Sequence, residues 1–242
     1  SRAWQNNLFT VDETDNDATT NEVFHWPGET YTLDFLVTRL SGWSKTDALA
    51  LVDRSKQADT AVVTSYTVVF DDDNKTYDMM NNPTADGMES AVSVMSRLGL
   101  SFYADTADQS VKADASVLGA SANIVMGYCS HGVHSGLGST YILDFLGFTY
   151  LPGALFMSYE SFNGQQFRGN PIGHGGHGQV ADFVYMGGSG GIGNVYEPLS
   201  SACGDESYLF PEYINCGRNL AEACYKSLRY VSWMETVLGD PL

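Results

Sequence analysis

Residues 122–132 read ANIVMGYCSHG, an apolar run that ends in a polar Ser-His-Gly turn. A short apolar run without polar alternation predicts a strand that is buried on both faces of a sheet. Residues 153–159, GALFMSY, predict a second strand of the same kind. Ligand sites on open parallel sheets lie at the carboxyl ends of the strands. The residues at the ends of these two strands are therefore the first candidates for a functional site.

The rest of the chain alternates between strand-like and helix-like segments. Further strands are predicted at 30–40, 60–70, 100–103, 193–196 and 233–238. Helices are predicted at 44–56, 85–98, 179–186 and 219–228, with a short helix or apolar lid at 141–148. This alternation predicts a three-layer α/β sandwich with a mainly parallel sheet. Residues 160–178 and 197–217 are predicted to be long loops.

A glycine-rich run at 187–193 contains GSGGIG, which is close to a nucleotide-binding pattern. It follows a predicted helix and enters a predicted strand, which is the reverse of the order that nucleotide-binding loops require. The run therefore predicts a tight helix-to-strand turn.

The composition narrows the class of protein. The 242 residues fit one domain spanning 1–242, with an acidic N-terminal segment at 1–29. Twelve basic and 29 acidic residues give a net charge of −17, which argues against nucleic-acid or anionic-membrane partners. No apolar run reaches the roughly 18 residues of a membrane-spanning helix. The acidic, lysine-poor composition is typical of proteins secreted into salty or calcium-bearing surroundings.

Four of the five histidines form two HxxH pairs in glycine-rich loops. The pairs are His131 with His134, and His174 with His177. Imidazole nitrogens bind zinc, copper or nickel, so the two pairs together could supply a transition-metal site. Ordinary hydrogen bonding within the loops is the alternative interpretation.

An acidic turn after the strand at 60–70 suggests a different metal. Asp71, Asp73 and Asp78 could offer carboxylate oxygens to calcium, although the spacing is not that of an EF-hand. A solvated acidic turn is the alternative.

The ends of the two buried strands also suggest a nucleophile and a base. His131 is the candidate base, and a cysteine nucleophile would be expected near the end of the second strand. None is present there. Ser158, Ser161 and Cys129 are the remaining candidate nucleophiles, and a serine would also need an oxyanion hole.

Four cysteines permit three disulfide pairings. Cys203 and Cys216 flank a Tyr/Pro/Glu segment and could close it as a disulfide. Packing of all four as reduced thiols is the alternative.

Several ordered stretches resemble a bacterial family of uncharacterised proteins. They are 36–43 (LVTRLSGW), 127–132 (GYCSHG), 151–154 (LPGA), 195–198 (VYEP), 219–222 (NLAE), 232–233 (SW) and 239–242 (GDPL). The family is distantly similar to gingipain-like and caspase-like cysteine peptidases, in which a His-Gly strand end is followed by a nucleophile strand. The resemblance implies a caspase-like α/β fold.

This chain differs from the family pattern at the histidine and at the expected cysteine, and these differences favour a non-catalytic function. The family usually has Trp where His131 stands, and the peptidase cysteine would align near Ser158 or Tyr159. Family members also carry more chain before the first recognised strand, so we expect a processed or partial chain that lacks its N-terminal strands. Its expected partners are other copies of itself or the missing segment of its own precursor.

Three functions are consistent with the sequence. The first is a non-catalytic extracellular or cell-surface protein that acts in assembly or binding. The second is a hydrolase that uses His131 with Ser158, Ser161 or Cys129. The third is a metal-binding protein that uses the two histidine pairs.

Overall fold

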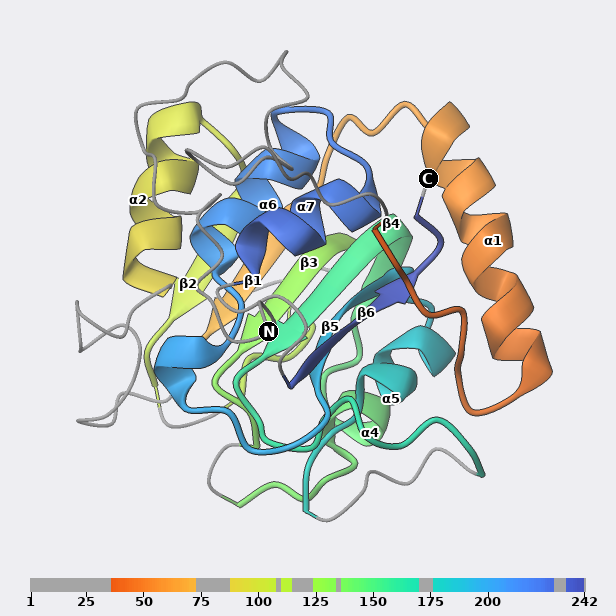
Figure 1. The fold of residues 1–242 in the computed structure, drawn as a ribbon. Helices are drawn as coiled ribbons and strands as arrows, with labels where there is room; N and C mark the ends of the chain where they lie inside the picture. Colours follow the sequence, from red (N-terminus) through yellow and green to blue (C-terminus); the bar gives the residue numbers. More distant parts are fainter. Residues whose placement is uncertain are drawn as a thin grey trace, which may run out of the picture.

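A six-stranded sheet lies at the centre of the part of the chain that the structure describes (Figure 1). The computed structural model describes residues 36–72, 88–107, 110–114, 124–133, 136–169, 176–228 and 234–241. The strands are β1 (Thr67–Asp71), β2 (Phe102–Asp105), β3 (Ile124–Ser130), β4 (Thr149–Ser158), β5 (Gly190–Asn194) and β6 (Glu235–Gly239). They lie in the order β2-β1-β3-β4-β5-β6, and among these described strands the β5–β6 pairing is antiparallel while the other four are parallel.

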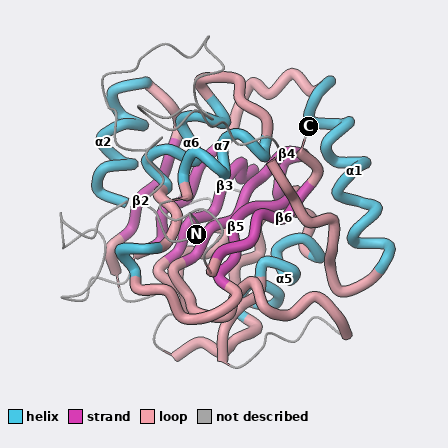
Figure 2. Tube along the Cα trace, in the orientation of Figure 1, coloured by secondary structure: helices cyan, strands magenta, loops and turns pink. Residues whose placement is uncertain are grey.

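Helices cover both faces of the sheet, which confirms the predicted α/β class with a mainly parallel sheet (Figure 2). One layer contains α1 (Lys45–Thr60), α4 (Tyr141–Asp144) and α5 (Val180–Tyr185). The other contains α2 (Met88–Leu98), α6 (Glu206–Ile214) and α7 (Leu220–Ser227). A short 3-10 helix, η4 (Ser200–Ala202), precedes α6.

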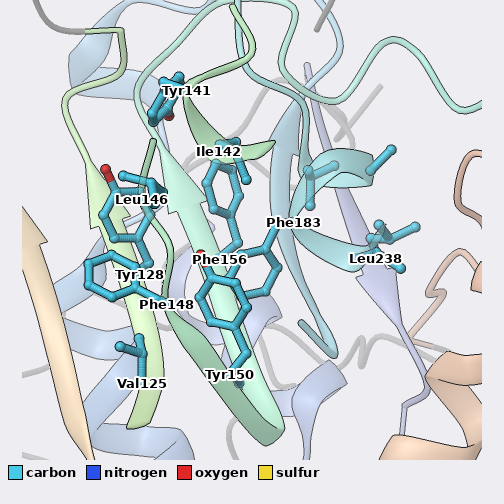
Figure 3. Packing of buried hydrophobic residues seen from close by; sticks show 14 of the residues in the cluster. Val125, Tyr128, Tyr141, Ile142, Leu146, Phe148, Tyr150, Phe156, Phe183 and Leu238 are labelled. Atoms are coloured by element: carbon cyan, nitrogen blue, oxygen red, sulfur yellow. The ribbon is translucent and has the colours of Figure 1, made fainter. Parts of the chain in front are cut away.

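The strands divide their side chains between two cores because successive residues point to opposite faces. In β4, Phe156 packs toward α5 while Leu155 and Met157 pack toward α6 and α7. Figure 3 shows the first core, where the ring centroids of Phe156 and Phe183 are 5.3 Å apart. Both faces of the central strands are buried, so their sequences are continuously apolar.

Helix α1 begins where the sequence predicts it. Ser44 caps the helix by accepting a hydrogen bond from the Asp47 N–H, and the Asp47 carboxylate accepts from the Ser44 N–H in return. The preceding Trp43 is buried, and its Nε1–H donates to Asp182 Oδ1 at 2.8 Å. These contacts fix the start of α1 against α5.

Three predictions about local structure are corrected. The segment 197–217, predicted to be a loop, contains η4 and α6. The Asp205 carboxylate caps the start of α6, and this helix accommodates Pro211. In the strand predicted at 30–40, the described residues 36–40 form only a single bridge, at Arg39. The strand predicted from Thr60 begins at Thr67, since α1 continues to Thr60.

The glycine run forms the predicted helix-to-strand turn only at 187–189, because β5 begins at Gly190 and not at the predicted residue 193. Helix α5 ends at Tyr185, Gly187 has a φ of 112°, and β5 begins at Gly190. Gly191 has a φ of 146°, and a Cβ there would lie 1.9 Å from the Phe156 carbonyl oxygen. Only glycine permits this close approach of β5 to β4.

Replacing Gly191 therefore tests how tightly the sheet is packed. We expect Gly191→Ala to lower the free energy of unfolding by about 3 kcal/mol, since the methyl group has no room and the backbone angle is unfavourable. Urea denaturation measures the change. Gly138→Ala is the matched control, because a Cβ at Gly138 meets nothing within 4 Å. Equal stability of the two variants would contradict the described packing.

Candidate functional site

The residues singled out at the strand ends do meet at one edge of the sheet. The ends of β1, β3 and β4 are aligned, with Asp71 opposite Ser130 and Ser130 opposite Ser158. The His131 N–H donates to the Asp71 carbonyl at 2.9 Å, and the Tyr159 N–H donates to the Ser130 carbonyl at 3.1 Å. We name this region the carboxyl edge. It contains the turns after β3 and β4.

Cys129 lies just before this edge but is fully buried among the side chains under α6 and α7. Burial raises the pKa of its thiol well above the ordinary value, and the charge of Glu206 raises it further. A thiolate is the nucleophilic form of cysteine, so this environment disfavours nucleophilic catalysis by Cys129.

Ser158 is also buried, and its hydroxyl is engaged by Glu160. The Ser158 hydroxyl donates to Glu160 Oε2 at 3.2 Å and accepts from the Glu160 N–H at 3.1 Å. The serine therefore stabilises the turn after β4.

Glu160 is the central polar group of the carboxyl edge, and the sequence analysis did not select it. Its carboxylate is buried and also accepts from the Tyr141 hydroxyl at 3.0 Å and the Gly178 N–H at 3.2 Å. A Cβ on Gly132 would lie 2.3 Å from the Glu160 Cγ, so the glycine of the Ser-His-Gly turn leaves space for this side chain. The position of a glutamate directly after a buried strand could have identified it.

His177 forms the solvent-facing end of the Glu160 contacts. Its Nδ1 lies 3.7 Å from Glu160 Oε1, and its side chain is 32% exposed. The interaction of the imidazole with the Glu160 carboxylate raises the pKa of His177, and burial opposes this shift. The ring also lies beside Phe162, with centroids 6.0 Å apart.

The turn after Glu160 has an unusual backbone. Phe162 has a φ of 60°, which is uncommon for a residue with a side chain. Asn194 holds the turn, since its Nδ2 donates to the Glu160 carbonyl at 2.9 Å and to the Ser158 carbonyl at 3.2 Å. Ser161 is half-buried, and its hydroxyl makes no hydrogen bond to the residues that the structure describes. Ser161 is thus the most accessible of the three candidate nucleophiles.

Buried tyrosine hydroxyls bind both Asp71 and Glu160. Tyr128 donates to Asp71 Oδ2 at 2.6 Å and Tyr141 donates to Glu160 Oε2 at 3.0 Å, while the Ser130 hydroxyl exchanges hydrogen bonds with the Gly132 backbone. Burial raises the pKa of Asp71 to about 8, although hydrogen bonds from Tyr128 and the Val111 N–H lower it. Asp71 is therefore largely protonated near neutral pH.

The proposed metal ligands are only partly within the described residues. His131 and His177 are described, whereas His134 and His174 lie outside, as do Asp73 and Asp78. Within the described ranges, no group of three or more His, Cys, Asp or Glu residues could hold a metal ion. Asp71 is bound to Tyr128 and Val111 rather than placed in an open acidic turn.

All four cysteines are free thiols, so the disulfide considered between Cys203 and Cys216 is not formed. Cys203 is buried with its Sγ 3.8 Å from Asn194 Nδ2, whereas Cys216 is partly exposed after α6. The alternative, four reduced cysteines, describes the structure.

Comparison with known proteins finds no family model, curated protein or solved structure that matches this chain. Among the described residues, no helix has the length and apolar character needed to cross a membrane. The function must therefore be argued from the carboxyl edge itself.

The contact between Glu160 and His177 can be tested directly. Glu160→Gln removes the negative charge and is expected to lower the pKa of His177, as followed by NMR titration of the imidazole protons. Glu197→Gln is the control and should lower it less, because Glu197 contributes only a weaker charge interaction. An unchanged His177 pKa in Glu160→Gln would contradict the described contact.

The raised pKa of Asp71 predicts a pH-dependent stability. The pKa of Asp71 is higher in the folded than in the unfolded state. Its contribution to the free energy of unfolding therefore falls as pH rises from about 4 to about 8. We expect the free energy of unfolding of Asp71→Asn, relative to wild type, to increase over this pH range. Urea denaturation at several pH values measures the free energy of unfolding of both proteins. A constant difference between wild type and Asp71→Asn across this range would contradict the raised pKa.

Proposed function

We propose that this protein is a non-catalytic bacterial protein with a caspase-like fold, which acts outside the cell in assembly or binding. The features implied by the peptidase resemblance support the fold. A His-Gly turn follows β3, and β4 lies directly beside β3 in a mainly parallel sheet. The net charge of −17 supports an extracellular or cell-surface location.

The hydrogen bonding of Glu160 is the observation that carries the proposal. A peptidase of this plan needs a reactive side chain at the end of the nucleophile strand, close to the histidine. Here Ser158 stands at the strand end, and its hydroxyl is bonded to the buried Glu160 carboxylate, which also accepts from Tyr141 and Gly178. The nearby cysteine is enclosed in the other core, away from solvent.

Such a network favours a rigid surface over a reactive one. Buried polar groups that are satisfied by fixed partners hold one conformation, and rearranging them costs their hydrogen bonds. The turn that contains Ser161 and Phe162 is held by Asn194 in the same way. Next to it, Tyr196 is 56% exposed and contacts the Phe162 ring, which offers an aromatic surface for a protein partner.

The non-catalytic proposal predicts that His131 is dispensable. We expect His131→Ala to change the free energy of unfolding by less than about 1 kcal/mol, because the side chain is partly exposed. We also expect self-association, measured by sedimentation velocity, to be unchanged. Loss of self-cleavage of a longer precursor in this variant would refute the proposal.

A hydrolase that uses Ser161 with His131 is the second candidate. It is favoured by the Ser161 hydroxyl, which is unbonded within the described part of the chain, and by the left-handed backbone of Phe162 beside it. Unusual backbone angles cluster at functional sites.

Covalent labelling separates the two candidates. We expect a fluorophosphonate probe to leave Ser161 unmodified in wild-type protein, as judged by intact mass and peptide mapping. Ser161→Ala and Ser158→Ala serve as matched controls. Stoichiometric labelling that Ser161→Ala abolishes and Ser158→Ala retains would establish the hydrolase instead.

A further inference from the structure

Residues 36–40, which we name the strap, run along the outer edge of β6 before the chain turns into α1 (Figure 1). The Arg39 N–H donates to the Val237 carbonyl at 2.8 Å, and the Gly239 N–H donates to the Arg39 carbonyl at 3.0 Å. Arg39 and Leu238 form a parallel bridge. The strap therefore extends the sheet beyond β6 through one short main-chain pairing.

Two side chains outside β6, those of Tyr225 and Phe167, also contact the strap. The Tyr225 hydroxyl of α7 accepts from the Val37 N–H at 3.2 Å and donates to the Val37 carbonyl at 3.0 Å. The Arg39 guanidinium lies 4.2 Å above the centre of the Phe167 ring. Both contacts use the backbone or the charged side chain of the strap, so they do not depend on burying its apolar residues.

Two of the three apolar residues of the strap are exposed, and the third, Leu36, is half-buried. Val37 is 69% exposed and Leu40 is 49% exposed. Exposed hydrogen bonds contribute about 1 kcal/mol each, so the strap is attached by a few weak contacts. Edge segments with few buried contacts belong to the least stable parts of a folded protein.

The adjoining helix is anchored separately. Trp43 is buried and bonded to Asp182, and the capping contacts of Ser44 fix the first turn of α1. Ser41 and Gly42 connect these anchors to the strap. The strap can therefore leave β6 while α1 and the core stay in place.

We propose that the strap is an exchangeable edge strand, and that a second copy of this chain docks by placing its own strap on the β6 edge. The structure shows a segment that fits this edge, because the chain's own strap is paired with β6. Exchange between identical copies recreates the same contacts and needs no new complementary surface. Pairing at a sheet edge is a common route to association, since unpaired main-chain groups there accept another strand.

Charge complementarity also favours this occupant. Arg39 is the one charged residue in 36–40, so the strap is basic, whereas the whole chain carries −17. A basic segment presented to an acidic copy gains from electrostatic attraction. The strap and the carboxyl edge use different residues, so this proposal can fail while the proposed non-catalytic function stands, and the reverse also holds.

The first test opens the β6 edge in the full chain. Arg39→Pro removes the N–H that binds Val237, so the chain's own strap no longer competes for the edge. A fluorescent peptide of residues 36–42, LVTRLSG, is then titrated and followed by anisotropy. We expect the R39P chain to bind it at least tenfold more tightly than wild-type chain does. The same peptide carrying R39P is the control and should bind at least tenfold more weakly. Equal binding of the two peptides would overturn the proposal.

The second test measures association of the intact protein. We expect sedimentation velocity between 5 µM and 1 mM to show a concentration-dependent dimer that Tyr225→Phe weakens at least tenfold. Tyr185→Phe is the matched control, because Tyr185 is an exposed tyrosine of α5 (51%) whose hydroxyl takes no part in the hydrogen bonds of the strap. This test stands even where R39P fails to fold. A wild-type chain that stays monomeric up to 1 mM would overturn the proposal, and peptide binding without dimerisation would assign the edge to another protein's strand.

Discussion

The buried carboxylate of Glu160 is the constraint on which the rest of the carboxyl edge depends. A buried charge is costly unless donors surround it, and here the donors come from β4, α4 and the segment before α5. A side chain at Gly132 would clash with the Glu160 side chain, and His177 Nδ1 lies 3.7 Å from the Glu160 carboxylate. One carboxylate thus contacts the turn after β3, the turn after β4 and the segment before α5.

The same arrangement supports the proposed non-catalytic role. The ends of β3 and β4 meet at a hydrogen-bonded network centred on Glu160. A second buried carboxyl group, that of Asp71, accepts from the Tyr128 hydroxyl and the Val111 N–H, and burial raises its pKa to about 8. We infer that the network stabilises the shape of the edge, which suits a binding surface.

The sequence predicted the central strands because they are apolar on both faces, and it predicted α1 and α7, whose first turns are capped by Ser44 and Asn219. It missed α6, since Pro211 and the polar residues around it look like a loop. It overestimated the first strand because residues 36–40 are strand-like in composition but pair through Arg39 alone. It placed Ser158 and His131 at the correct edge but overlooked Glu160, whose role depends on donors distant in the sequence. Such contacts depend on strand register and side-chain burial, and the spacing of residues along the sequence predicts neither.

The most direct test of the central claim is proteolysis of an unbiased peptide library by the purified full chain, read by mass spectrometry. The account predicts the same peptides with wild-type protein, with His131→Ala and with buffer alone. Sequence-specific cleavage by the wild type that disappears in His131→Ala would contradict it, and would show that the carboxyl edge is a working active site.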